Sequence, residues 1–211
     1  MPSFELTNFS VFIFAAVVLA ITPGPGMLYV LARTVSGGRA DGIASTLGTG
    51  LGGLVHVFIA AVGLSTLLAA SANAFLVVKY IGAAYLLFLG VRTILSARKQ
   101  LAFEAVQASG AKRAFFEGVL TEALNVKTAL FFLAFIPQFV SHQTAAAPQF
   151  VALGLICVLL NTTVDFLVVL GTARLLPYLK RSPKPMKWMS YGSGVVLLGL
   201  GGYVALADAK S

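Results

Sequence analysis

The chain has 211 residues, of which 58% are hydrophobic and only 10% are charged, and its mean hydropathy is +0.92. A soluble domain carries about 25% charged residues, so this chain has too few polar groups to cover a surface that faces water. The net charge is +8, but the basic residues lie in short connections between apolar runs, which is typical of a membrane protein and argues against nucleic-acid binding.

Six apolar runs follow one another, and each is long enough to cross a bilayer as a helix, which takes about 20 residues. Because Met1–Asn8 contains Glu5 and no lysine or arginine, we expect the first run to be a retained span rather than a signal peptide. The predicted spans are Phe9–Leu31, Gly42–Leu68, Phe75–Leu95, Ala114–Val140, Phe150–Ala173 and Trp188–Leu206. The sequence therefore predicts an all-α membrane protein, with one transmembrane domain over residues 1–211.

The first span is interrupted by Pro23, Gly24, Pro25 and Gly26. Proline removes an amide donor and glycine adds backbone freedom, so four such residues in a row predict a broken helix. Irregular backbone at membrane depth is tolerated only against protein or a water-filled cavity. We therefore predict that these four residues bind substrate, with the N-terminus of a half-helix meeting an anionic group. A kink that serves only packing is the alternative.

The second span carries Gly48, Gly52 and His56 at positions i, i+4 and i+8. Small residues let a neighbouring helix approach closely, so we expect Gly48 and Gly52 to serve helix packing. His56 continues this protein-facing stripe. Histidine titrates near neutral pH, so His56 is a candidate for proton coupling, and a neutral hydrogen-bonded interior histidine is the equal alternative.

The fourth span contains Glu122, Asn125 and Lys127. Asn125 lies about 11 residues into the span, which is roughly 16 Å deep and near the midplane. An ionisable group at this depth is a functional-site candidate, and we expect all three residues to bind substrate and Glu122 also to take part in proton coupling. On an unbroken helix Lys127 would point about 140° away from Glu122, so Lys127 needs a partner on another helix or a local break.

The fifth span contributes Asn161 and Asp165, which are four residues apart and share a face. An aspartate inside a span is expected to face the protein interior and to be paired or protonated. Asp165 is therefore a second candidate for proton coupling, with Lys127 as its natural partner.

The two halves of the chain look related, because Tyr80–Gly90 and Tyr191–Gly201 match at several positions with a constant offset. Three spans in each half would make the repeat inverted, with interrupted helices 1 and 4 and a binding site at the repeat interface. Chance similarity between apolar helices is the alternative. The odd-numbered connections are the basic ones, so we predict that they face the cytoplasm and that both termini lie outside. The first holds Arg33 and Arg39, and the third holds Arg98, Lys99, Lys112 and Arg113.

Several motifs resemble those of the LysE/RhtB family of bacterial amino-acid exporters, and the resemblance covers nearly the whole chain. They are Pro23-Gly24-Pro25, Val55-His56, Tyr80–Leu86, Asn125-x-Lys127 and Phe131–Val140. The resemblance implies six helices in the bacterial inner membrane and export of amino acids such as lysine, homoserine, threonine or leucine, with proton exchange. The chain departs from the family motifs at Gly26, where asparagine is usual, and at Val126, where proline is usual.

The predicted function is export of small neutral amino acids, of the homoserine, threonine or leucine type, by a secondary transporter that uses protons as coupling ions. Export of a cationic amino acid or another small solute, and metal-cation efflux, are the alternatives. Two histidines and a single cysteine, Cys157, argue against a metal site and against a thiol–disulfide electron carrier. No nucleophile–base pair is visible, so we expect neither an enzyme nor a bound cofactor. The small-residue stripes suit internal packing or a homo-oligomer equally well.

Overall fold

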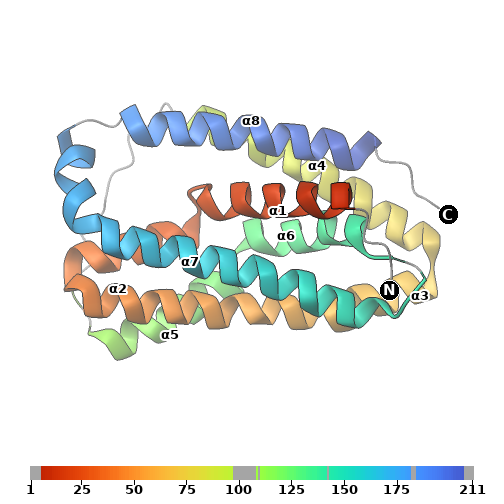
Figure 1. Ribbon diagram of the computed structural model, residues 1–211, viewed down its shortest axis with the longest axis horizontal. Helices are drawn as coiled ribbons and strands as arrows, with labels where there is room; N and C mark the ends of the chain where they lie inside the picture. The colour runs from red at the N-terminus through yellow and green to blue at the C-terminus, as the bar shows by residue number, and fades with distance from the viewer. Residues whose placement is uncertain (1–5, 97–107, 109, 142, 182–183, 207–211) are drawn as a thin grey trace.

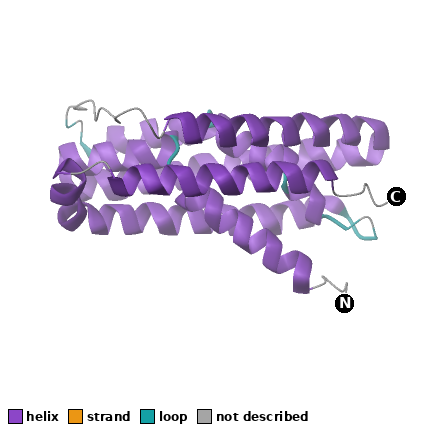
Figure 2. Ribbon diagram, turned by 90° about the horizontal axis from the view of Figure 1, so that it is seen from above, coloured by secondary structure: helices purple, strands orange, loops and turns teal. Residues whose placement is uncertain are grey.

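The computed structural model describes residues 6–96, 108, 110–141, 143–181 and 184–206, and this part of the chain is helical and contains no strand. The all-α prediction is therefore confirmed for these residues. The helices are α1 (Leu6–Ile21), α2 (Pro25–Ile59), α3 (Ser65–Ala70), α4 (Ala72–Ser96), α5 (Ala111–Ala123), α6 (Val126–Ala134), α7 (Ala146–Arg181) and α8 (Lys184–Leu206). A π-helical segment, Ala60–Leu64, follows α2, and a 3₁₀ turn, Ile136–Phe139, follows α6. The long helices run side by side in an elongated bundle (Figures 1 and 2).

The first predicted span is broken at the expected place. The helix α1 ends at Ile21, and the backbone at Gly24 is extended, with φ −143° and ψ −179°, before α2 begins at Pro25. Inside α2, Gly38 has a φ of +77°, which an L side chain rarely adopts, and the helix reverses there. The turns of α2 before Gly38 therefore continue the first predicted span, and those after it form the second (Figure 1).

The fourth predicted span is also broken, although Val126 stands where a proline is usual. Its two parts, α5 and α6, meet at Leu124 and Asn125 and are bent by 42°. Asn125 has an extended backbone, with φ −73° and ψ 102°, and its side chain caps the start of α6 by accepting a hydrogen bond from the Lys127 amide. Asparagine is among the strongest N-cap residues, so the break forms without proline.

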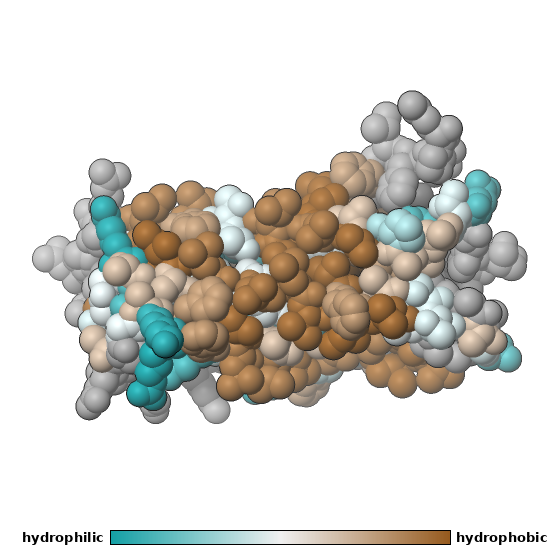
Figure 3. Space-filling model, turned by 90° about the horizontal axis from the view of Figure 1, so that it is seen from below, coloured by the Kyte–Doolittle hydropathy of each residue, from teal (hydrophilic) through white to brown (hydrophobic). Residues whose placement is uncertain are grey.

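The apolar surface agrees with a membrane protein. Three helical stretches, Pro25–Leu64, Leu76–Leu95 and Ala146–Thr172, are long and apolar enough to cross a bilayer, and α5 with α6 makes a fourth as a bent pair. Phe9–Ile21 and Ser190–Leu206 are shorter apolar helices. A hydrophobic belt crosses the middle of the molecule, with hydrophilic side chains towards its two ends (Figure 3). Six spans and an inverted repeat remain predictions.

The main apolar core is built from residues of the α6 region together with residues of α1, α4, α7 and α8. Four phenylalanines form its centre, and the ring centroids of Phe131 and Phe135, and of Phe135 and Phe139, are 4.8 Å apart. Phe12 of α1 meets Phe139 edge-on at 5.4 Å. This packing fixes the positions of α1 and α6, and therefore the helix ends where the two broken spans meet.

Two glycines of α2 lie against the backbone of α5. A Cβ at Gly48 would collide with the Phe115 carbonyl oxygen, and one at Gly52 would collide with the Val119 carbonyl oxygen. From the other side, a Cβ at Gly118 would lie 2.8 Å from the Ser45 carbonyl oxygen. The two helices thus touch through their main chains, which brings Glu122 of α5 next to α2.

The structure describes only part of the predicted basic connections. Lys112 and Arg113 are exposed at the start of α5, whereas Arg98 and Lys99 lie outside the described residues. Arg33, expected in the first connection, lies instead within α2 and is 4% exposed, because the helix continues beyond the end of the predicted span.

Candidate functional site

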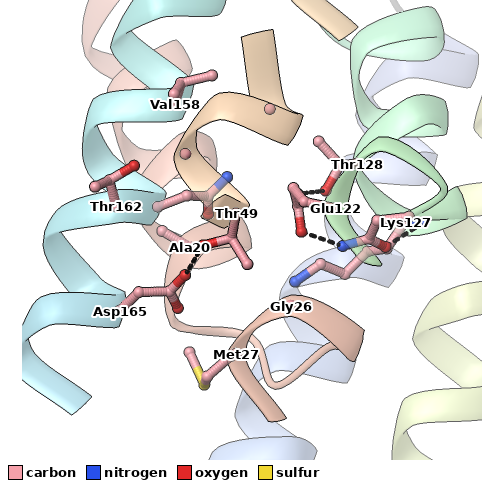
Figure 4. A pocket seen from close by; sticks show the side chains of 14 residues that line it. Ala20, Gly26, Met27, Thr49, Glu122, Lys127, Thr128, Val158, Thr162 and Asp165 are labelled. Atoms are coloured by element: carbon pink, nitrogen blue, oxygen red, sulfur yellow. Dashed lines mark hydrogen bonds between the residues drawn. The ribbon is translucent and has the colours of Figure 1, made fainter. Parts of the chain in front are cut away.

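A polar pocket lies where the two broken spans face α7 and the second part of α2 (Figure 4). It contains about 450 Å³ of empty space, counting its open mouth. The residues that line it are Ala20, Gly26, Met27, Thr49, Gly50, Gly53, Glu122, Asn125, Lys127, Thr128, Val158, Asn161, Thr162 and Asp165. The interrupted helices thus open onto one cavity.

Lys127 is in the first turn of α6, and its ammonium group reaches the broken end of α1. Its Nζ donates hydrogen bonds to the carbonyl oxygens of Thr22, at 2.8 Å, and Leu19, at 3.2 Å. The last carbonyls of a helix lack a full set of helical partners, so the lysine caps this end of α1. The Leu19 oxygen also accepts a 3.2 Å bond from the Thr22 amide. A Cβ at Gly24 would lie 2.9 Å from this ammonium nitrogen, so only glycine leaves it undisturbed room.

Glu122 is 7% exposed, and both of its carboxylate oxygens accept hydrogen bonds. Asn125 Nδ2 donates to Oε2 at 2.9 Å, and Thr128 Oγ1 donates to Oε1 at 2.6 Å. Asn125 lies in the α5–α6 break and Thr128 lies in the first turn after it. The backbone geometry of the break therefore positions the two groups that hold the Glu122 carboxylate.

Gly26 lies at the other side of this carboxylate. A Cβ at position 26 would collide with Glu122 Oε2. Gly26 and Met27 are in the first turn of α2, whose first helical hydrogen bond runs from the Leu28 amide to the Gly24 carbonyl at 2.9 Å. The amides before Leu28 lack helical partners and present the positive end of the helix dipole to the pocket.

Asp165 of α7 is the second buried carboxylate in the pocket, 7% exposed. Thr49 Oγ1 donates a 3.0 Å hydrogen bond to its Oδ2. The predicted pairing with Lys127 is wrong as a direct contact, since no ion pair joins these two described residues, and the Lys127 ammonium is engaged by the α1 carbonyls. Oδ1 accepts no hydrogen bond from the described residues.

His56 lies behind the pocket. Its Nε2 donates a 2.8 Å hydrogen bond to the Glu122 carbonyl oxygen, which also accepts a 2.9 Å bond from the Asn125 amide where α5 ends. The His56 ring lies 5.9 Å from that of Phe132. It is not among the lining residues, so it contacts the site through the main chain of Glu122.

The structure brings most of the predicted site together. Gly26, Glu122, Asn125, Lys127 and Asp165 all line the pocket. The other predicted substrate-binding residues, Pro23, Gly24 and Pro25, do not line it and instead shape the adjoining backbone.

Sequence reasoning missed Thr49 and Thr128, which fix the two carboxylates. Each is a hydroxyl within an apolar span, and that was the available signal. Thr49 and Asp165 are 116 positions apart, so spacing alone does not pair them, whereas Thr128 is only six positions from Glu122.

A second polar cluster ties the first part of α2 to α5. Arg33 forms an ion pair with Glu117, whose Oε1 also accepts a 2.7 Å hydrogen bond from Arg113 Nε. The Tyr29 hydroxyl donates to the Ala114 carbonyl oxygen at 2.9 Å and also bonds Glu117. The cluster fixes the half-helix that carries Gly26.

Replacing Glu117 by glutamine is expected to lower the stability of the protein by about 1–3 kcal/mol, because charge-assisted bonds to the buried Arg33 are lost. The matched variant Arg113→Gln removes a partner whose side chain is 70% exposed and should change stability by less than about 1 kcal/mol. Thermal unfolding of both purified variants in detergent measures this difference. Equal unfolding temperatures would contradict the assigned importance of the Arg33–Glu117 contact.

The fold and the site define a multi-pass membrane protein with a charged pocket between broken helices, which is a transporter architecture. The chain belongs to the family of LysE type translocators, whose profile matches residues 17–208. This confirms the family resemblance found in the sequence.

Similar proteins are found in several bacteria. An uncharacterised membrane protein of Pseudomonas aeruginosa is 32% identical over 99% of both chains, and one of Vibrio cholerae is 32% identical over 94% of this chain and 96% of its own. The homoserine/homoserine lactone efflux protein of Salmonella typhimurium is 29% identical over 93% of this chain and 95% of its own. No solved structure matches the chain.

Proposed function

We propose that this protein exports small neutral amino acids of the homoserine type across the bacterial inner membrane, by exchange with protons. The observation that carries this proposal is the arrangement of opposite charges in the pocket. Lys127 and the unpaired amides of α2 are suited to a carboxylate, and Asp165, with an unpartnered carboxylate oxygen, is suited to an ammonium group. An amino acid carries both groups on one carbon.

The proposed roles of the two acids differ. Glu122 already accepts bonds from Asn125 and Thr128, so its proposed role is to hold the site in shape beside Gly26. Asp165 either accepts the substrate ammonium or carries a proton, and a carboxyl group cannot do both. Substrate and proton therefore exclude each other at this position, which is what antiport requires.

The proposed topology has six spans, with helices 1 and 4 interrupted as in an inverted repeat, the basic connections in the cytoplasm and both termini in the periplasm. The beginning of α1 and the end of α8 lie towards the same end of the bundle (Figure 1). An even number of spans requires this arrangement.

Export of a cationic amino acid is the second candidate. The pocket holds two carboxylates and one lysine, so its formal charge suits an additional positive group. The hydrogen bonds that already engage Glu122 favour the neutral substrate.

The proposal is tested by loading bacterial cells with a mixed dipeptide pool and measuring every amino acid released, with the protein expressed or absent. Faster release of one or a few neutral amino acids, sensitive to an uncoupler, is the expected result. Selective release of lysine or arginine would favour the second candidate. No change for any amino acid, with the protein present in the membrane, would reject amino-acid export.

Replacing Asp165 by asparagine is expected to lower the rate of export, because the substrate ammonium loses its carboxylate. The export that remains should no longer depend on an inward proton gradient, because the side chain can no longer exchange a proton. Efflux from vesicles with and without a pH gradient measures this. The comparison variant is His56→Gln, since His56 was the other predicted coupling residue. If efflux loses its dependence on the pH gradient in His56→Gln but not in Asp165→Asn, proton coupling would be assigned to His56 instead of Asp165.

A further inference from the structure

Two polar side chains of the pocket have no partner in the described part of the chain. Asn161 and Thr162 of α7 both line the pocket, and neither side chain makes a hydrogen bond with another described residue. Both side chains are half-buried, so their polar groups are open to the pocket and can bond a ligand or water there.

Three other threonines in the same helices behave differently, whereas the buried hydroxyl of Thr46 in α2 also lacks a partner among the described residues. The hydroxyls of Thr34, Thr163 and Thr172 donate to the carbonyl four residues earlier, at 2.7, 2.7 and 2.5 Å respectively. This local bond is the usual way in which a helical threonine satisfies its hydroxyl group in an apolar setting. Thr162, one position before Thr163, does not make it, which leaves its hydroxyl available.

The packing of α7 on α2 determines where the Thr162 hydroxyl lies. Thr162 Oγ1 would lie 3.0 Å from a Cβ at Gly50, and Val158 Cγ2 would lie 3.0 Å from a Cβ at Gly53. The glycines therefore let the α7 side chains pack closely on α2, as Figure 4 shows for Thr162 and Val158 beside the α2 ribbon. Thr162 is three residues from Asp165 and Asn161 is four, so both lie about one turn from the proposed ammonium site.

We propose that Asn161 and Thr162 form the side-chain subsite of the transporter, and that this subsite selects amino acids whose short side chain ends in a hydroxyl or carbonyl group. This inference rests on the proposed function. Lys127 and Asp165 bind the charged groups of the substrate. Asn161 and Thr162, one turn away, are therefore placed to contact its side chain. Val158, Gly50 and Gly53 also line the pocket, and the packing of Thr162 and Val158 on the two glycines narrows it, so we expect this subsite to take a short side chain.

We therefore expect the subsite to discriminate against amino acids with a purely hydrocarbon side chain. A substrate with a methyl group in place of the hydroxyl would bury Asn161 and Thr162 without partners, and a site built for a polar group rejects such an analogue. Homoserine and 2-aminopentanoate form a suitable pair, because their side chains differ only by hydroxyl against methyl. We expect the full-length protein to export homoserine about tenfold faster than 2-aminopentanoate at equal concentration.

The experiment measures efflux of both compounds from proteoliposomes that contain the full-length protein. Thr162→Val and Asn161→Leu are each expected to reduce the preference for homoserine severalfold while still exporting 2-aminopentanoate. Thr163→Val is the matched control, since this neighbouring residue is exposed and its hydroxyl bonds its own helix. Thr162→Ser, which keeps the hydroxyl, should retain the preference and shows that any loss in Thr162→Val is due to that group.

The outcomes separate the two proposals. Export of both compounds at equal rates by the unmodified protein would overturn the polar subsite and leave amino-acid export standing. Unchanged preference in both Thr162→Val and Asn161→Leu would also overturn the assignment of these residues. Failure to export either compound or any other amino acid would overturn both proposals.

Discussion

Replacing Lys127 by alanine is expected to reduce export about 100-fold, because the substrate carboxylate loses its cation in the pocket. The same change removes the donor to the Thr22 and Leu19 carbonyls, so the broken end of α1 loses two hydrogen bonds. Initial rates of homoserine efflux, normalised to the amount of protein in the membrane, measure the effect.

Two further variants make the Lys127 result interpretable. Lys112→Ala removes an exposed lysine at the start of α5 and should leave export unchanged. Lys127→Arg keeps the positive charge but cannot place a compact ammonium group beside Gly24, so we expect export between that of Lys127→Ala and the unmodified protein. Normal export by Lys127→Ala at normal expression would remove Lys127 from the binding site.

The second large effect is expected for Gly48→Ala, which should destabilise the fold by about 1–3 kcal/mol. The added Cβ would collide with the Phe115 carbonyl oxygen and would lie 3.1 Å from the Val119 amide nitrogen. Backbone atoms cannot move aside as a side-chain tip can, so α2 and α5 must separate. Because α5 carries Glu122, export should fall together with stability.

The matched control is Gly199→Ala in α8, where a Cβ would meet nothing within 4 Å. Alanine is the better helix former by about 1 kcal/mol, so this variant should be neutral or slightly more stable. Thermal unfolding in detergent and efflux rates provide the two measurements. If Gly48→Ala and Gly199→Ala unfold at the same temperature, the main-chain contact between α2 and α5 is not important for stability.

The features that the sequence predicted well are local ones. The apolar runs, the break at Pro23–Gly26 and the burial of Glu122 and Asp165 follow from residue type and spacing within a single segment. On an unbroken helix Lys127 would point away from Glu122, and this already indicated a possible break between them. The structure places the break at Asn125, which caps the start of α6.

The features that it missed depend on which helices meet. The contact of Lys127 with the Leu19 and Thr22 carbonyls joins residues more than 100 positions apart, and no pattern in either segment indicates it. A carboxylate was the expected partner because opposite charges attract, but the carbonyls at the end of α1 are also strong acceptors. Arg33 was expected near water because helix ends are poorly fixed by hydropathy.

The close approach of Gly26 and Glu122 limits how this sequence can change. Asparagine, the usual residue of the family motif at position 26, would place its Cβ against the Glu122 carboxylate, so introducing it alone should be harmful here. The effects of substitutions at positions 26 and 122 should be non-additive, since each position sets the space left to the other. A lineage that carries Gly26 with Glu122 would therefore need the Glu122 carboxylate to shift before position 26 could hold a larger side chain, so we expect the effect of a change at position 26 to depend on residue 122.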